Sequence, residues 1–408
     1  MQKSKKPLRV LYSFPLKIGA ARICTTAWHQ VEGLHAAGAK VTVFPASISR
    51  SFPTSVSVSP TLSLGKLRLP HRLLSRLAYA DLHDRIVARR LEKMADQIDI
   101  VHTWPIGSLR TLQTAQRLGI PTVLERCNAH TRFAYEVVQK ECDRLGVPLP
   151  RGHEHAYDAK LLQKEEAEYD LAYRLLCPSD FVVKTFVEQN IPREKLVRHI
   201  YGFDETLFYP DTQPIEPKRG LTMISVGVCA VRKGLHYALE AWLSSPAHHD
   251  GQFLIAGDFV KAYAEKLAPL LKHPSIKILG HRNDIPDLMR KSDILVLPSI
   301  EEGFGLVCTE AMASGCVPIV SEACTDLCKH MDNALIHPVG GASALSQHIT
   351  LLHEDRRLLQ KLRTAGLLLA PNITWHAAGV TLLKLYEEIV SNSTLSKTPP
   401  TRHADSSC

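Results

Sequence analysis

The sequence predicts an α/β protein built from two doubly wound parallel sheets, each with helices on both faces. Three observations favour this class. Short apolar segments alternate with helical patterns along most of the 408 residues. The first of these segments precedes a glycine-containing loop and a helix, and a polar, proline-bearing stretch at 209–220 separates two such series. Strands that alternate with helices are typical of parallel sheets joined by helical crossovers.

The first series opens with a strand–helix–strand pattern. The apolar run LRVLYSF at 8–14 precedes a helical pattern, and KVTVFPA at 40–46 is the next strand. Later strand-like runs are IDIVHTW at 98–104 and IPTVLERC at 120–127. We assign residues 1–205 to this N-terminal domain.

The second series contains five strand-like runs separated by helices or loops. Between 221 and 321 they are LTMISVG, QFLIAGD, IKILG, DILVLPS and CVPIVS. We assign residues 206–372 to a C-terminal domain. The tail at 391–408 is rich in Ser, Thr and Pro, and we expect it to be disordered. A ligand is expected in a cleft between the two halves, beyond the carboxyl ends of the strands.

Charge and hydropathy narrow the range of possible binding partners. Lys and Arg together exceed Asp and Glu by 49 − 41 = 8. This surplus suits a phosphate-rich ligand or an anionic membrane face, and it is too diffuse to indicate nucleic acid. No run approaches the ~18 apolar residues of a membrane span. The basic start resembles that of a signal peptide, but the apolar stretch after it is short and broken by Pro15 and Lys17, and no small-residue cleavage site follows. We therefore expect a cytoplasmic protein.

The ten cysteines predict neither a metal site nor a disulfide framework. Most of them lie singly in apolar segments, where free cysteine behaves as a small hydrophobic residue. The closest pair, Cys324 and Cys328, has no His or Cys partner at zinc-binding spacing nearby.

The segment EEGFGLVCTEAMASG at 301–315 places carboxylates where an apolar strand ends and an apolar helix begins. A solvated loop explains Glu301. It does not explain Glu310, which is flanked by LVCT and AMAS, because an unpaired charge is costly to bury. A carboxylate at this place could accept both hydroxyls of a ribose. The alternative is that Glu310 pairs with a Lys or Arg in the core.

The segment VGVCAVRKG places Arg232, Lys233 and Gly234 where the first strand of the second series ends. Two cations beside helix-terminal amides would form a good diphosphate-binding site. The alternative is that the basic pair lies in a solvated turn. Gly303 and Gly305 allow close backbone approach, and a helix from about Leu306 would offer free N–H groups to an anion.

The stretch PSIEEGFGLVCTEAMASGCVPIVS resembles the signature of the family 4 (group 1) retaining glycosyltransferases, in which seven residues separate two glutamates. Glu302 and Glu310 have that spacing. The similarity covers about residues 8–390, through DIVHTW, CPSDFV, YGFDETLFYP, VRKG and IAGD in the expected order. The resemblance implies the GT-B architecture, in which two Rossmann-like domains face each other across a cleft. The C-terminal domain would hold a nucleotide-sugar donor, and a last helix at about 375–390 would pack back on the N-terminal domain.

The resemblance also implies roles for individual residues. Glu310 would bind the ribose and Glu302 would face the transferred sugar. Arg232 and Lys233 would neutralise the diphosphate. The remaining donor contacts would come from Gly303, Phe304, Gly305 and Leu306 through backbone amides, from His281 and Arg282 around the base, and from Gly19 near the phosphates or the acceptor.

Two departures and one open choice accompany these roles. Many relatives have Arg where this chain has Val228, so Arg232 would supply that charge. Many have a second glycine where this chain has Ala20. The histidine that contacts the sugar in relatives matches His130 best, with His102 as the alternative.

The implied reaction is metal-independent sugar transfer to a hydroxyl of a glycan, lipid-linked or small-molecule acceptor, as in polysaccharide biosynthesis. The nucleotide sugar would be a substrate, so no separate cofactor is expected. The chain contains no Asp-x-Asp pair, which is consistent with cationic side chains in place of a divalent metal. The alternatives are a GT-B sugar-nucleotide epimerase or hydrolase, and a catalytically silent sugar-nucleotide-binding partner of another transferase.

The segment 66–90 predicts one or two basic amphipathic helices. Such a face either contacts anionic lipid peripherally or forms an outer helix of the first domain.

Overall fold

The computed structural model describes residues 6–64, 67–68, 74–150, 152–211 and 220–395. These described residues form two compact units, one made from the segments 6–125, 164–175 and 379–395, the other made from 126–163 and 176–378. Most of the predicted tail, from 396 onward, lies outside the described residues, as do 212–219 of the predicted linker. Residues 391–395 are helical and continue the last helix of the chain.

The first sheet has seven strands in the order β3-β2-β1-β6-β7-β8-β9. Its strands are β1 (Arg9–Ile18), β2 (Lys40–Ile48), β3 (Ser57–Val58), β6 (Ile100–Thr103), β7 (Thr122–Glu125), β8 (Arg174–Cys177) and β9 (Leu196–Arg198). β1 pairs in parallel with both β2 and β6, and β6 pairs in parallel with β7. A separate antiparallel pair joins β4 (Ser63–Leu64) and β5 (Leu67–Arg68).

The helices in the N-terminal half of the chain follow the strands as the sequence predicts. They are α1 (Ile23–Ala36), α2 (Arg76–Lys93), α3 (Leu109–Leu118), α4 (Thr131–Leu145), α5 (Ala159–Leu171) and α6 (Asp180–Glu188), with short 3-10 turns η2 (Ala95–Gln97) and η3 (Arg193–Lys195). In the first unit, Val87 and Leu91 of α2 pack with Leu11 of β1 and Val101 of β6, so apolar side chains from helix and sheet share one core.

The second sheet has six strands in the order β12-β11-β10-β13-β14-β15. They are β10 (Thr222–Val226), β11 (Gln252–Ala256), β12 (Ile276–Gly280), β13 (Ile294–Leu297), β14 (Val317–Ser321) and β15 (Leu335–His337), and the pairings along the sheet are parallel. The helices that follow them are α7 (Leu235–Ser244), α8 (Lys261–Leu271), α9 (Ile285–Arg290), α10 (Leu306–Ala313), α11 (Ala342–Glu354), α12 (Arg356–Leu369) and α13 (Trp375–Leu395), with 3-10 turns η4 (Val231–Lys233), η5 (Pro246–His248) and η6 (Ala370–Ile373).

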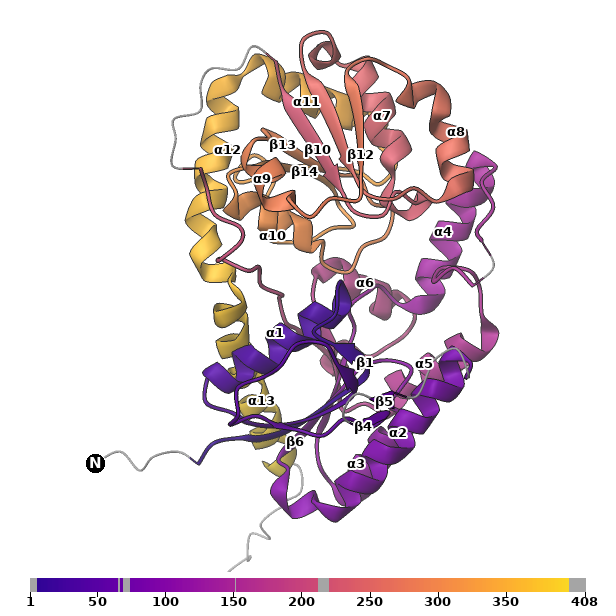
Figure 1. Ribbon diagram of the computed structural model, residues 1–408, viewed down its shortest axis with the longest axis vertical. Helices are drawn as coiled ribbons and strands as arrows, with labels where there is room; N and C mark the ends of the chain where they lie inside the picture. Colours follow the sequence, from indigo (N-terminus) through magenta and orange to yellow (C-terminus); the bar gives the residue numbers. More distant parts are fainter. Residues whose placement is uncertain (1–5, 65–66, 69–73, 151, 212–219, 396–408) are drawn as a thin grey trace, which may run out of the picture. The chain divides into compact units, whose positions relative to one another are not determined.

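Both faces of the second sheet are buried, as the near-continuous apolar strands predict. On β13, Ile294 and Val296 belong to a core shared with α7, α8 and α11, whereas Leu295 and Leu297 belong to a core shared with α9 and α10. Side chains alternate between the faces of a strand, so an apolar run such as this one supplies both cores. Figure 1 shows this layered arrangement around β10, β13 and β14.

The observed units divide the chain differently from the predicted domains, because the segment 126–163 groups with the second unit. Val138 and Cys142 of α4 lie in the same apolar core as Val231 and Tyr263. A buried polar contact adds to this packing, since the Glu141 carboxylate accepts a hydrogen bond from the Tyr237 hydroxyl at 2.6 Å.

The last helix belongs mainly to the first unit, which includes the chain from Gly379 onward. Gly379 lies so close to α1 that an added Cβ would be 2.4 Å from the carbonyl carbon of Gly33. Further along α13, Tyr386 is fully buried and its hydroxyl contacts the His102 ring at 2.5 Å.

Residues 66 and 69–73 of the predicted basic amphipathic segment lie outside the described residues. Leu67 and Arg68 form strand β5, where a helix was predicted, and residues 76–90 form most of α2, with Val87 in the core and Arg85 and Arg89 exposed. Among the helices of the described residues, none is long and apolar enough to cross a membrane.

Candidate active site

The candidate site lies where the strand order of the second sheet reverses. β10 and β13 are neighbours, and the chain continues from them into opposite halves of the sheet. At such a switch point the two connecting loops separate and leave room for a ligand at the carboxyl ends of the strands. The loop after β10 carries the VRKG motif and the loop after β13 carries EEGFG, so the fold brings together two motifs about 70 residues apart in the sequence.

Arg232 and Lys233 follow β10 in the 3-10 turn η4. Gly234 ends this turn with a φ of +66°, and an added Cβ would lie 2.0 Å from the carbonyl oxygen of Pro298. The Ile300 N–H donates to the Arg232 carbonyl oxygen at 2.9 Å. The close approach permitted by glycine therefore holds the turn against the end of β13.

Glu302 is buried and directly contacts both predicted phosphate-binding cations. Its carboxylate forms an ion pair with Lys233 and lies 3.6 Å from Nη1 of Arg232. It also accepts hydrogen bonds from the Ser299 hydroxyl at 3.3 Å and the Gly303 N–H at 3.2 Å. The structure thus brings Glu302, Arg232 and Lys233 together in one cluster, and their roles toward a donor stay predictions.

The expectation that Glu301 lies in a solvated loop is wrong. Its side chain is 0% exposed. Nη1 of Arg232 donates to its main-chain oxygen at 2.9 Å and to its Oε2 at 3.0 Å, and the Ala129 N–H donates to its Oε1 at 3.2 Å. The charge tolerates burial because it is paired and hydrogen-bonded.

Burial and ion pairing act in opposite directions on the two carboxylates. Burial raises the pKa of Glu301, but the Arg232 charge and the contact with His155 outweigh it and lower that pKa to about 2. Burial likewise raises the pKa of Glu302, and the charges of Lys233 and Arg232 bring it below its ordinary value. Both carboxylates are therefore ionised at neutral pH, and the four charges of the cluster sum to zero.

His155 is a neighbour of the site that the sequence reasoning missed. It is 6% exposed, and its Nε2 lies 3.4 Å from Oε2 of Glu301. The segment GHEHAYD at 152–158 carried one visible signal, two histidines around a glutamate, but no spacing linked it to the glutamate motif.

The glycine-rich loop after β13 is tightly enclosed. An added Cβ on Gly303 would lie 1.7 Å from the Cys127 carbonyl oxygen. Gly305 has a φ of +72° and caps α10, which begins at Leu306 as predicted. Phe304 is 2% exposed, and its ring packs edge-on against Tyr201.

Glu310 is partly buried on α10, and its carboxylate has no hydrogen bond or ion pair with any residue that the structure describes. The alternative in which Glu310 pairs with a Lys or Arg is therefore not observed in that part of the chain. Burial raises the pKa of Glu310 to about 7. An acceptor group without a partner is what a ribose-binding role requires.

This pKa predicts a pH dependence of nucleotide binding. The ionised carboxylate accepts two ribose hydroxyls better than the protonated form does, so nucleoside diphosphate affinity should rise as pH increases from about 6 to 8. Calorimetric titration should show a steeper rise for the native protein than for Glu310→Gln, in which the titrating group is absent. Parallel pH profiles would contradict the assignment.

The raised pKa of Glu310 also makes the stability of the fold depend on pH. The folded pKa of about 7 lies above the ordinary value of 4.5. The native state therefore binds more protons than the unfolded chain in this range, and the contribution of Glu310 to stability is full below pH 4.5 and is lost as pH rises through about 7.

The two candidate histidines lie in different units. His130 caps α4, with its Nδ1 accepting the Arg132 N–H at 3.2 Å and its ring packed edge-on against Phe186. Burial lowers its pKa to about 3, so the ring is neutral at physiological pH. His102, in the first unit, is fully buried beside Tyr386. These contacts are structural, and a sugar-binding role for His130 stays a prediction.

The remaining predicted residues are His281, Arg282 and Gly19. His281 and Arg282 are exposed after β12, and Arg282 pairs with Asp284 at 2.5 Å. Gly19 belongs to the first unit, where its φ is +74° and an added Cβ would lie 2.5 Å from Cβ of Arg50. Their proposed contacts with base and phosphates remain predictions.

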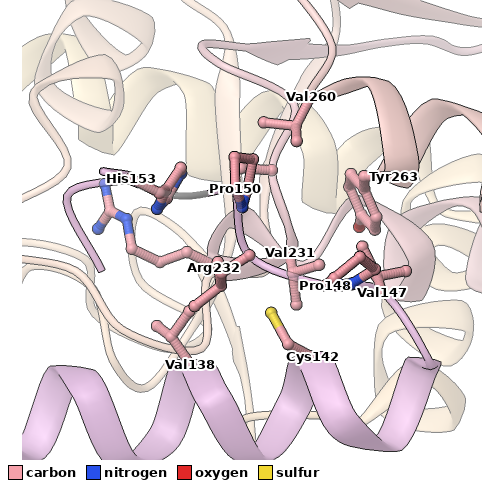
Figure 2. A pocket seen from close by; sticks show the side chains of 12 residues that line it. Val138, Cys142, Val147, Pro148, Pro150, His153, Val231, Arg232, Val260 and Tyr263 are labelled. Carbon is pink, nitrogen blue, oxygen red and sulfur yellow. The ribbon is translucent and has the colours of Figure 1, made fainter. Parts of the chain in front are cut away.

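A small pocket adjoins Arg232 (Figure 2). Most of its lining is apolar and comes from α4, the 147–150 segment and the neighbourhood of η4. Figure 2 shows the Arg232 guanidinium directed toward His153, away from the apolar part around Tyr263. Within the described residues, no group of three or more His, Cys, Asp or Glu side chains is arranged to hold a metal ion.

The two α/β sheets form the GT-B fold, and family comparisons give the class of protein. Residues 211–367 match the model of the glycosyl transferases group 1, and residues 25–203 match that of glycosyltransferase family 4. The chain belongs to the group 1 and family 4 glycosyltransferases.

Individual relatives give the same class. The chain is 33% identical over 124 residues to the N,N'-diacetylbacillosaminyl-diphospho-undecaprenol alpha-1,3-N-acetylgalactosaminyltransferase of Campylobacter jejuni, covering 30% of this chain and 33% of that protein. It is 25% identical over 244 residues to the putative glycosyltransferase EpsF of Bacillus subtilis, covering 54% of this chain and 63% of that protein. These matches span less than two thirds of either relative.

A solved structure shows the same fold over nearly the whole chain. HepE from Anabaena, crystallised with UDP, superimposes with a TM-score of 0.64 at 15% identity, covering 93% of this chain and 100% of that one.

Proposed function

We propose that this glycosyltransferase is a retaining enzyme that uses a nucleotide-sugar donor and transfers the sugar to an acceptor hydroxyl. The observation that carries the proposal is the arrangement at the switch point of the second sheet. Two cations and Glu302 meet there, and on the following helix Glu310 has an unpartnered carboxylate among the described residues. All of these residues belong to the second unit, in support of a C-terminal domain that holds the donor.

The chemistry follows from where charge develops. As the bond between the sugar C1 and the phosphate oxygen breaks, the sugar acquires oxocarbenium character and the departing diphosphate gains negative charge. Lys233 and Arg232 stabilise that charge. The acceptor oxygen attacks C1 from the same face, and its proton passes to the departing phosphate oxygen. Glu302 faces the positively charged sugar.

The class of acceptor is proposed from the name of the Campylobacter relative, which describes transfer to a sugar on diphospho-undecaprenol. A glycan or lipid-linked acceptor is therefore our first choice, with a small-molecule hydroxyl as the alternative. Peripheral contact with anionic lipid through 66–90 would suit a lipid-linked acceptor and stays a prediction.

The decisive experiment is a screen of UDP-, GDP- and ADP-sugars by thermal shift, followed by mass detection of glycosylated product. Binding stabilises the fold in proportion to occupancy, so the correct donor should raise the melting temperature. Retention at C1 would be read from the anomeric configuration of the product. Donor hydrolysis without a glycosylated product would favour the hydrolase alternative, and binding without any turnover would favour a silent partner.

Transfer should survive chelation. Because the cations of Arg232 and Lys233 take the place of a divalent metal in this proposal, initial rates in EDTA should equal those without it. The matched sample contains EDTA with excess Mn²⁺. A rate that disappears in EDTA and returns with Mn²⁺ would contradict the assignment of the two cations.

A further inference from the structure

Arg232 uses only some of its hydrogen-bond donors on the described part of the protein, and its side chain is 13% exposed. Nη1 makes the contacts to Glu301 and lies near Glu302. Among the described residues, Nε and Nη2 make no hydrogen bond to protein, although a guanidinium has five N–H donors. A diphosphate on Arg232 would therefore share the guanidinium with a carboxylate that is already in place.

Glu301 has no assigned contact with the donor, yet it is the most deeply buried acid of the cluster. Besides Arg232, the Ala129 N–H and His155 contact its two carboxylate oxygens. These contacts hold the charge in place and prevent it from moving away when another anion arrives. A fixed negative charge beside the phosphate-binding cation opposes the binding of any second anion.

The two nucleotide species of the reaction differ in charge. In the donor, each phosphate is substituted on both sides, and the two together carry two negative charges. Once the sugar leaves, the terminal phosphate keeps only its anhydride bond and gains a second ionisation with a pKa of about 6, so the product carries an additional charge at neutral pH. A site with only cations would hold this product more tightly than the donor and would slow its release.

We propose that Glu301 is an internal counter-anion that competes with the diphosphate for Arg232 and thereby speeds release of the nucleoside diphosphate product. This proposal rests on the proposed function, since it assumes a diphosphate at Arg232. It assigns Glu301 the role of a positioning and tuning residue, which acts through Arg232 and touches neither sugar nor acceptor.

The test compares native protein with Glu301→Gln, which keeps the size and the acceptor for Ala129 and removes the charge. Calorimetry uses whichever of UDP, GDP and ADP the native protein binds. Glu301→Gln should bind it about tenfold more tightly, and product inhibition should strengthen by the same factor. Without ligand the variant should melt at lower temperature, because Arg232 loses its buried partner, and the nucleotide should raise its melting temperature more than that of the native protein.

Two further variants test whether the tighter nucleotide binding arises at Arg232. Glu240→Gln makes the same chemical change on the exposed face of α7 and should leave affinity unchanged. In an Arg232→Gln background, Glu301→Gln should no longer tighten binding, because the competition is for that guanidinium. Equal or weaker nucleotide binding by folded Glu301→Gln would overturn the proposal.

Glu301→Asp serves if Glu301→Gln does not fold. It keeps the charge but withdraws it from Nη1, so affinity should rise by a smaller factor, about two- to threefold. Unchanged or weaker binding by Glu301→Asp would overturn the proposal as well. A native protein that binds none of the three nucleotides and forms no product would instead refute the proposed function.

Discussion

Lys233→Ala should lower kcat/KM for sugar transfer by about 10²–10³-fold, the loss typical when one preorganised charge is removed from a developing anion. Lys233 is the cation next to Gly234, which precedes α7, and in the described part of the chain it pairs with Glu302. The Lys233 side chain is 22% exposed and pairs with the buried carboxylate of Glu302. In such surroundings a unit charge stabilises a phosphate far more than it does in water.

Lys233→Arg and Lys266→Ala make this measurement specific. Lys233→Arg keeps the charge and should recover part of the lost kcat/KM. Lys266 is exposed on α8 in the same unit, and its replacement should leave kcat/KM unchanged. If folded Lys233→Ala retains the native kcat/KM, the diphosphate does not bind at this cluster.

The sheets were predictable from the sequence for a physical reason. A parallel strand buried on both faces needs apolar side chains in almost every position, and runs such as DILVLPS show this directly. β15 was not predicted, because its three residues, Leu335–His337, are too few to form a recognisable run. Helical crossovers between parallel strands lead to the neighbouring positions of β10 and β13. The VRKG and EEGFG motifs, which follow these two strands, then lie at the same edge of the sheet.

The grouping of 126–163 with the second unit could not be predicted in the same way. It depends partly on a buried polar contact between Glu141 and Tyr237, which are 96 residues apart. Helix periodicity shows that α4 has an apolar face but not which core this face joins.

The sequence motifs of the site could be predicted, but the burial and ion pairing of its carboxylates could not. The sequence placed Arg232, Lys233 and Glu302 together. It gave no sign that Glu301 is buried, because a carboxylate after a strand is usually solvated, and only a partner such as Arg232 makes its burial tolerable. His155 reaches Glu301 from 146 residues away, a separation over which composition carries no information.

The second large effect separates the two glutamates of the motif. Glu310→Gln should weaken binding of the free nucleoside diphosphate by about 10- to 100-fold, the equivalent of the roughly 1.5–3 kcal/mol of a hydrogen bond to a charged group. The ribose is bound in both ground and transition states, so donor KM should rise while kcat changes little. Calorimetry with the diphosphate and initial rates with the full donor measure the two quantities.

Glu302→Gln should affect catalysis and not binding. We expect kcat to be lower by about 10²-fold and affinity for the free diphosphate not to be weakened. Glu302 is assigned to the sugar, which the free diphosphate lacks. In the structure its carboxylate neutralises Lys233 and lies near Arg232, so its removal leaves both cations to the phosphates. Melting curves of both variants establish that they are folded. An equal loss of diphosphate affinity in the two variants would mean that the roles are wrongly assigned, and native affinity and rates in both would refute the site, because neither carboxylate would then touch the donor.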